Sequence, residues 1–200
     1  MARPKEPWKR DRILATAVEQ AQRIGASNLT IRDVAEAANV STATVHYHFD
    51  DIGGLIFGVL DRSMTEMYSS RKEKISGLNG AIDKLRVLVE LGVPDEVSPD
   101  VHFMYEAIPV VISRPEYQTV AHTFTQSQVG LYEAVIHEGV AEGVFHPIDA
   151  AHSIAQNFVA LEDAYDLYRV LGFVDDGEEG RKNIMNYAKA TLGHPGADLW

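Results

Sequence analysis

Residues 30–49 carry the pattern of two short helices joined by a tight turn, and no other part of the chain constrains the fold as strongly. Thr30 is a suitable N-cap for the first helix. Apolar residues then recur at helical spacing, at Ile31, Val34, Ala35 and Ala38. Asn39 follows at the turn, and Asn is one of the few non-glycine residues that tolerate a positive φ. Ser41 is suited to cap the second helix, so the pattern predicts a unit that places this helix in the major groove of DNA.

The second helix of this pattern leaves small or hydrogen-bonding side chains available to face outward: Thr42, Ala43, Thr44, His46, Tyr47 and His48. For Tyr47 the alternative is that its ring packs inside the small domain. His46 and His48 do not indicate a metal site, because side chains two residues apart on a helix point about 200° apart. We predict no metal site and no cofactor for this chain.

Composition excludes several other classes of protein. The chain has 200 residues, 46% of them hydrophobic, which is enough to bury a substantial core, and it has no cysteine. Disulfides, thiol nucleophiles and thiolate metal sites are therefore excluded. No run approaches the ~18 apolar residues of a membrane span, and the N-terminus lacks an apolar signal core. The cytoplasm is the expected location, with no membrane partner.

The net charge of −11 is distributed unevenly. Residues 1–50 contain seven Lys and Arg against six Asp and Glu, a balance of +1, so residues 51–200 contain 11 against 23, a balance of −12. A small basic arm precedes the first expected helix and consists of Arg3, Lys5, Lys9, Arg10 and Arg12. Such an arm favours contact with phosphates, although a disordered solubilising tail would have the same composition.

The pattern that begins at Arg12-Ile13-Leu14 resembles the DNA-binding domain of the tetracycline-repressor (TetR) family. It continues through Gly25, Thr30, Val34-Ala35, Ala38-Asn39-Val40-Ser41 and Thr44-Val45-His46-Tyr47-His48-Phe49 to Leu55. The resemblance covers the N-terminal quarter in detail and the rest in outline. It implies an all-α homodimer with a DNA-binding domain at residues 1–50 and a domain for effector binding and dimerisation at residues 51–200. The implied function is that of a repressor that leaves a palindromic operator when a small-molecule effector binds.

The same resemblance assigns roles to individual side chains. Base edges of the double-stranded operator would be met by Thr42, Ala43, Thr44 and His46. Phosphates or sugars would be held by Tyr47 and His48, and Arg32 would reach either a phosphate or a base. Two departures from the family pattern stand out: Asn39 replaces the usual turn glycine, and Ile52 stands where members often have a lysine that contacts phosphate. The negative charges of Asp50 and Asp51 beside Ile52 make the local electrostatic potential still less favourable for binding a phosphate.

Helical periodicity extends through the rest of the chain, and we predict an all-α fold of about nine helices. The first is expected at residues 8–24, followed by the two helices of residues 30–49. The others are expected at residues 51–77, 81–91, 100–112, 115–143, 149–172 and 178–192. No segment shows strand-like alternation.

In residues 149–172, apolar and aromatic residues are spaced 4, 3, 4 and 3 apart, at Ile154, Phe158, Leu161, Tyr165 and Tyr168. A seam of this kind packs against another helix, which belongs either to the same chain or to a second subunit. The family resemblance favours a second subunit, because the last two helices commonly form a four-helix bundle between subunits. Residues 132–147 and 160–164 also resemble, weakly, the C-terminal domain of the betaine-type repressor subgroup.

The candidate effector-binding residues mix aromatic and polar groups, as a ligand pocket requires: His102, Tyr105, Phe124, Gln128 and Asp163. Asp163 is singled out because it interrupts an apolar stretch. A carboxylate within an apolar surface must be paired, or be placed to bind a cationic or hydrogen-bonding ligand. A structural role, such as capping a neighbouring helix, is the alternative.

A helical enzyme or small-molecule carrier, or a purely dimeric interaction protein, would share the same fold class. The sequence has no nucleophilic cysteine, no phosphate-binding glycine loop and no His-Glu-x-x-His spacing. We therefore predict a DNA-binding regulator and not an enzyme.

Overall fold

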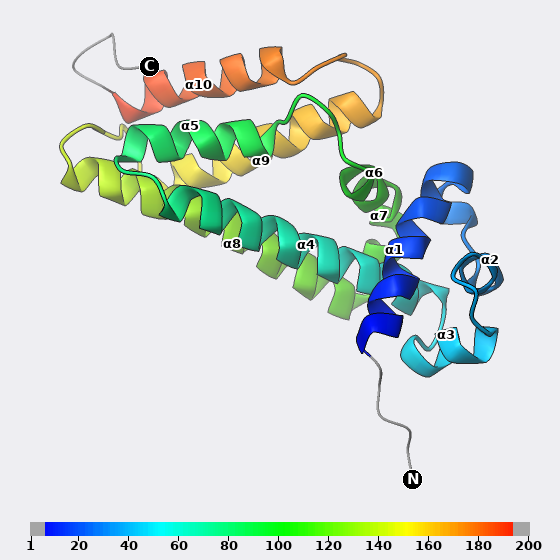
Figure 1. Ribbon diagram of the computed structural model, residues 1–200. Helices are drawn as coiled ribbons and strands as arrows, with labels where there is room; N and C mark the ends of the chain where they lie inside the picture. Colours follow the sequence, from blue (N-terminus) through cyan, green and yellow to red (C-terminus); the bar gives the residue numbers. More distant parts are fainter. Residues whose placement is uncertain (1–6, 194–200) are drawn as a thin grey trace. The chain divides into compact units, whose positions relative to one another are not determined.

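The structure is a computed structural model that describes residues 7–193, and every regular element in this range is a helix (Figure 1). The elements are α1 (Pro7–Ile24), a short 3-10 helix (Ala26–Asn28), α2 (Ile31–Ala37), α3 (Thr42–His48), α4 (Ile52–Ser76), α5 (Ala81–Gly92), α6 (Pro99–Glu106), α7 (Ile108–Ile112), α8 (Pro115–Ala141), α9 (Ala151–Val170) and α10 (Glu178–Leu192). The predicted all-α class is confirmed.

The helix expected at residues 100–112 is wrong as a single element, because the structure breaks it into α6 and α7 at Ala107. Pro109 explains the break. A proline has no N–H to donate to the carbonyl four residues earlier, and its ring disfavours helical backbone at the preceding residue. Pro109 instead occupies the first turn of α7, where its missing N–H costs nothing.

The chain divides into two compact units. The first comprises the chain up to Met64 together with Ser98–Ala121, and the second comprises Thr65–Val97 and the chain from His122 onward. Helices α4 and α8 therefore each contribute their first part to one unit and their second part to the other. These units describe packing, so the functional boundary expected at residue 50 stays a prediction.

Local capping interactions define α2 and α3 in the first unit. The Thr30 hydroxyl accepts a hydrogen bond from the Asp33 backbone N–H, and the Asp33 carboxylate accepts one from the Thr30 N–H, which together form a capping box. Asn39 has a φ of 52° and is the one non-glycine residue with positive φ in residues 7–193. Ser41 then caps α3. The predicted caps and turn are confirmed.

One face of α3 packs on the hydrophobic core of the first unit. Val45 and Phe49 are buried at and just after α3, and α1, α2 and α4 contribute further buried residues that include Ile13, Leu14, Val34, Leu55 and Val59. Gly58 of α4 is needed for this packing, because a Cβ at that position would lie 2.8 Å from the Phe49 ring and 3.2 Å from Leu14. The exposed face of α3 thus rests on a closed apolar core.

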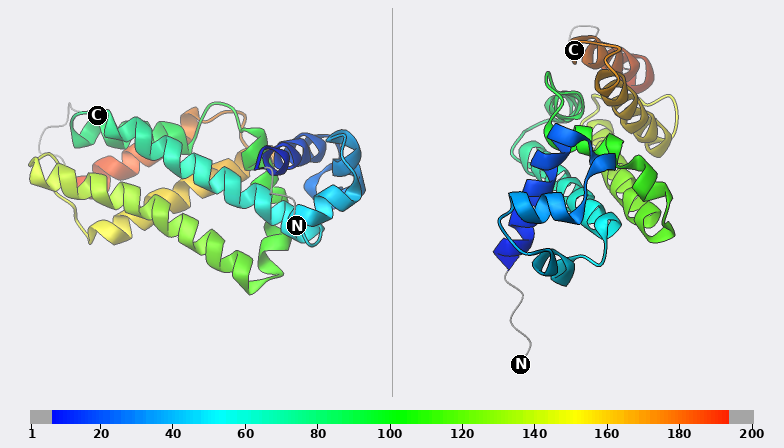
Figure 2. Two further views of the ribbon diagram at one scale, coloured as in Figure 1. Left: turned by 60° about the horizontal axis from the view of Figure 1, so that its bottom comes forward. Right: turned by 90° about the vertical axis from the view of Figure 1, so that its right-hand side faces the viewer.

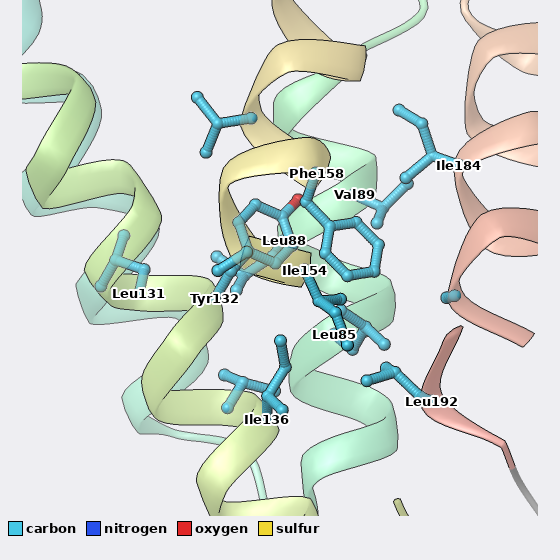
Figure 3. Close-up of a cluster of buried hydrophobic side chains, with 14 of the residues drawn as sticks. Leu85, Leu88, Val89, Leu131, Tyr132, Ile136, Ile154, Phe158, Ile184 and Leu192 are labelled. Atoms are coloured by element: carbon cyan, nitrogen blue, oxygen red, sulfur yellow. The ribbon is translucent and has the colours of Figure 1, made fainter. Parts of the chain in front are cut away.

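The second unit is built around one hydrophobic core, to which α5, α8, α9 and α10 each contribute (Figure 3). The stacked rings of Tyr132 from α8 and Phe158 from α9 lie at its centre, with centroids 4.8 Å apart. Tyr187 of α10 packs edge-on against Phe158, so α9 and α10 are neighbours, as the views of Figure 2 also show.

This core decides between the two interpretations of the seam in α9. Ile154 and Phe158 are buried within the protomer, Leu161 and Tyr165 are partly buried against the same core, and Tyr168 is exposed. The prediction that the whole seam packs against a second subunit is therefore wrong for Ile154 and Phe158. These two side chains already have apolar partners within their own chain.

Candidate DNA-binding and effector sites

Helix α3 presents most of the predicted DNA-reading side chains to solvent. Thr42, Ala43, His46 and Tyr47 are exposed, as is Arg32 on α2, while Thr44 and His48 are half-buried. Tyr47 is 53% exposed, which excludes the alternative that its ring fills the small domain. Six of these side chains therefore lie on α3 and Arg32 lies on α2, and their contacts with bases and phosphates stay predictions.

The two half-buried residues of α3 have partners within the protein. The Thr44 hydroxyl lies 2.8 Å from the Ser41 hydroxyl, and the Thr44 backbone N–H donates to the same Ser41 oxygen. The His48 ring lies edge-on to the Tyr47 ring, with centroids 5.1 Å apart. These contacts restrict the side chains before any DNA is bound, which lowers the entropy lost on binding.

The predicted basic arm is only partly described, and the expectation that it precedes the first helix is wrong for Lys9, Arg10 and Arg12, which lie in the first turns of α1. Arg3 and Lys5 lie outside the described residues. Within the described part, the guanidinium of Arg10 lies over the Phe49 ring, 5.5 Å from its centroid, and Arg12 is exposed. Of these two side chains, Arg12 is the freer to reach a phosphate.

The start of α4 is organised by Asp51, which caps the helix through a 2.7 Å hydrogen bond from the Gly54 N–H. Its second carboxylate oxygen accepts a hydrogen bond from Arg114, at 2.5 Å, and Arg114 also donates to the Tyr117 hydroxyl. The hydrogen bond from Arg114 and the one from the Gly54 N–H lower the pKa of Asp51. The expectation that Asp51 adds an uncompensated negative charge next to half-buried Ile52 is therefore corrected, because Arg114 neutralises it.

A buried ion pair lies in the second unit, between Arg71 of α4 and Glu162 of α9. Nη2 of Arg71 lies 2.8 Å from Oε1 of Glu162, Nη1 lies 3.1 Å from Oε2, and Nη2 also donates to the Leu88 carbonyl at 3.0 Å. The Tyr132 hydroxyl donates to Glu162 as well. Burial raises the pKa of Glu162, and the Arg71 charge opposes this effect.

Glu162 corrects the interpretation of its neighbour Asp163. The carboxylate of α9 that enters the apolar interior is Glu162, whereas Asp163 is exposed. Both lie in one apolar stretch of sequence, and only the rotation of α9 against α4 and α8 distinguishes them. Contact between Asp163 and an effector stays a prediction.

The other candidate effector residues lie in different surroundings. Gln128 is buried in the second unit, Phe124 lies one turn before it on α8 and is half-buried, Tyr105 on α6 is half-buried, and His102 is exposed. The structure thus brings Phe124 and Gln128 together on α8. Within residues 7–193 no three His, Asp or Glu side chains are grouped so that they could hold a metal ion. No helix of the described chain is long and apolar enough to cross a membrane.

Comparison with known proteins agrees with this geometry. Residues 13–59 match the family model described as bacterial regulatory proteins, tetR family. A TetR transcription regulator from Haloarcula marismortui ATCC 43049 has a similar structure, with a TM-score of 0.83, 22% identity and coverage of 92% of this chain and 98% of that chain. Curated protein sequences yield no significant match.

Two further structures of similar fold contain small molecules. One is a transcriptional regulator from Saccharomonospora viridis in complex with choline, with a TM-score of 0.80, 22% identity and coverage of 92% of this chain and 97% of that chain. The other is FadR from Bacillus subtilis in complex with stearoyl-CoA, with a TM-score of 0.71, 14% identity and coverage of 88% and 95%.

An exposed helix on a closed helix-turn-helix core, joined to a larger helical unit, defines a DNA-binding transcriptional regulator. Residues 13–59 are thus similar to the DNA-binding segment of the tetR family of bacterial regulatory proteins, and the whole described chain shares the fold of a TetR transcription regulator.

Proposed function

We propose that this protein is a ligand-responsive repressor that binds a palindromic operator as a homodimer and leaves it when a small-molecule effector binds. The observation that carries the proposal is α3, whose exposed polar and small side chains rest on the buried Val45 and Phe49. A rigid helix of this kind is suited to the major groove, with Thr42, Ala43, Thr44 and His46 toward base edges. Tyr47, His48 and Arg32 are placed to hold the backbone.

The second unit is proposed as the effector domain. Relatives of the same fold bind choline and stearoyl-CoA, which supports a small-molecule effector for this chain. The proposed contacts in this unit are Phe124, Gln128 and Asp163. The roles expected for His102 and Tyr105, which belong to the first unit, stay predictions. We further propose that the protein acts in the cytoplasm and has no enzymatic activity.

A mobility-shift titration tests the proposal. The duplexes are the DNA that flanks the coding region of this protein and a scrambled duplex of equal length and composition, each at several salt concentrations. We expect affinity for the flanking DNA to exceed that for the scrambled duplex by ~1,000-fold or more, and both affinities to fall as salt rises. Equal affinity for the two duplexes would contradict a sequence-specific repressor.

The dimer surface is proposed at the end of α9, where Tyr168, Leu171 and Phe173 are exposed apolar residues close together in sequence. Leu171→Glu with Phe173→Glu should give a monomer with an unchanged circular dichroism spectrum, because no core contact is lost. Operator affinity should fall at least tenfold, since two linked domains are needed to span half-sites about 34 Å apart.

Ile112→Glu is the matched control, because Ile112 is as exposed as Phe173 but lies in α7. It should leave the molar mass from light scattering at the dimer value. A double variant that remains dimeric would contradict this surface.

A further inference from the structure

An exposed tryptophan lies at the start of α1. Trp8 is 57% exposed, although tryptophan is highly buried on average. The ammonium group of Lys9 lies 5.3 Å from the centroid of its ring, a cation–π contact. Arg12 follows Trp8 by four residues, which places it one turn along on the same face of the helix, and it is exposed as well. Together Trp8, Lys9 and Arg12 form what we call the Trp8 surface.

This end of α1 carries a net positive charge and consists largely of hydrogen-bond donors. Residues 7–12 contain Lys9, Arg10 and Arg12 against Asp11, three cations against one carboxylate, a balance of +2. Ammonium, guanidinium and indole N–H groups donate hydrogen bonds and do not accept them. The oxygens of a phosphate diester only accept hydrogen bonds, so the chemistry of the Trp8 surface complements the backbone of DNA.

Contacts within the first unit place the Trp8 surface beside α3, as Figure 1 also shows. The guanidinium group of Arg10 lies 5.5 Å from the centroid of the ring of Phe49, the residue that ends α3. The two side chains also meet at α4, because a Cβ at Gly58 would lie 2.8 Å from Phe49 and 3.6 Å from Arg10. A duplex bound at α3 would therefore pass close to the Trp8 surface.

Helix α3 lacks the permanent positive charge that duplex binding requires, since its seven residues include no lysine or arginine. At the start of α4, the guanidinium group of Arg114 is paired with Asp51. Neutralisation of phosphates by cations supplies most of the sequence-independent affinity of a protein for DNA, so this charge must come from neighbouring elements. The Trp8 surface lies next to α3 and supplies two cations, Lys9 and Arg12.

We propose that the Trp8 surface is a second DNA-binding site, which holds the sugar–phosphate backbone next to the groove that α3 enters. The ring of Trp8 packs on a deoxyribose and its indole N–H donates to a phosphate oxygen, while Lys9 and Arg12 neutralise neighbouring phosphates. A backbone contact carries no sequence information, so this site adds affinity for specific and random duplexes alike. The inference rests on the proposed DNA-binding function.

Trp8→Ala tests the aromatic contact. We expect it to weaken binding to the operator and to a scrambled duplex by a similar factor of about tenfold, because the apolar area that the ring buries on DNA is lost. The salt dependence of both affinities should not change, since the indole carries no charge. Ile24→Ala is the matched control, because Ile24 is an exposed apolar residue at the other end of α1. It should bind both duplexes like the wild type, and both variants should keep the wild-type circular dichroism spectrum and melting temperature.

Arg12→Gln tests the charged part of the surface. It should make the log–log slope of affinity against salt shallower by about 0.9 per lost phosphate contact, and so by up to about 1.8 per dimer. Arg23→Gln removes the same charge from the last turn of α1 and should leave the slope unchanged. A residue that only stabilises α1 would not change the salt dependence in this way.

Tryptophan fluorescence reports on the contact directly. The sequence contains two tryptophans, Trp8 and Trp200, so Trp200→Phe leaves Trp8 as the one tryptophan that emits. Titration of this variant with a scrambled duplex should quench the emission of Trp8, with the same midpoint as the mobility shift.

Three results would each overturn the inference and leave the proposed repressor function intact: unchanged affinity in Trp8→Ala, a loss confined to the operator, or unchanged Trp8 emission when duplex is bound. A wild-type protein that binds neither duplex would refute the proposed function, and this second site with it.

Discussion

Arg71→Met is expected to lower the free energy of unfolding by about 3–5 kcal/mol. The substitution keeps most of the side-chain volume but leaves the Glu162 carboxylate buried without its cation. Within residues 7–193, the one remaining side-chain hydrogen bond to Glu162 comes from the Tyr132 hydroxyl. Urea unfolding followed by circular dichroism at pH 7 measures the loss, and part of it should disappear at acid pH, where Glu162 takes up a proton.

The double variant Arg71→Met with Glu162→Met should recover most of this stability, because a buried ion pair replaced by apolar side chains of similar volume costs little. The side chain at position 162 should be unbranched, because it packs against the backbone of Gly92. A Cβ added at Gly92 would lie only 1.7 Å from Oε1 of Glu162. The double variant thus separates the unpaired charge from lost packing.

Arg86→Met serves as the control. Arg86 pairs with Asp83 at 2.7 Å, but both side chains are largely exposed, so its loss should cost less than about 1 kcal/mol. If Arg71→Met and Arg86→Met had equal effects, the buried pair would not hold α4 against α9. A double variant no more stable than Arg71→Met would show that packing, not charge, dominates at this position.

His46→Ala should lower affinity for the specific operator by about 1–3 kcal/mol, equivalent to roughly 5- to 150-fold, with little effect on a scrambled duplex. His46 is exposed on α3, and its removal leaves the buried Val45 and Phe49 in place. A selective loss would come from a missing contact to a base edge. Titration of both duplexes at one salt concentration gives the two affinities directly.

Tyr47→Phe is the matched comparison, because it removes one hydroxyl from the neighbouring exposed side chain. If Tyr47 holds a phosphate, the change should weaken specific and scrambled binding to a similar extent. Equal losses on both duplexes for His46→Ala would assign His46 to the backbone as well. If His46→Ala lowered the affinity for neither duplex, the face of α3 that carries His46 would not enter the major groove.

Several features of this protein are determined by residues close together in the chain. Thr30 and Ser41 cap their helices, and Asn39 adopts the positive φ of the turn. A cap or a turn depends on hydrogen bonds within about four residues, so the residue type is itself the main cause. The helix-turn-helix and the all-α class were predictable for this reason, and the break at Pro109 follows from the same local chemistry.

Other features depend on contacts between distant segments. Arg71 and Glu162 are 91 residues apart, and Asp51 and Arg114 are 63 apart, so no local pattern pairs them. Helical periodicity identifies an apolar stripe on α9 but does not say what covers it. The tertiary structure placed Phe158 in the protomer's own core and Glu162, not Asp163, in the interior. Burial depends on how neighbouring helices pack, and that is a property of the assembled fold.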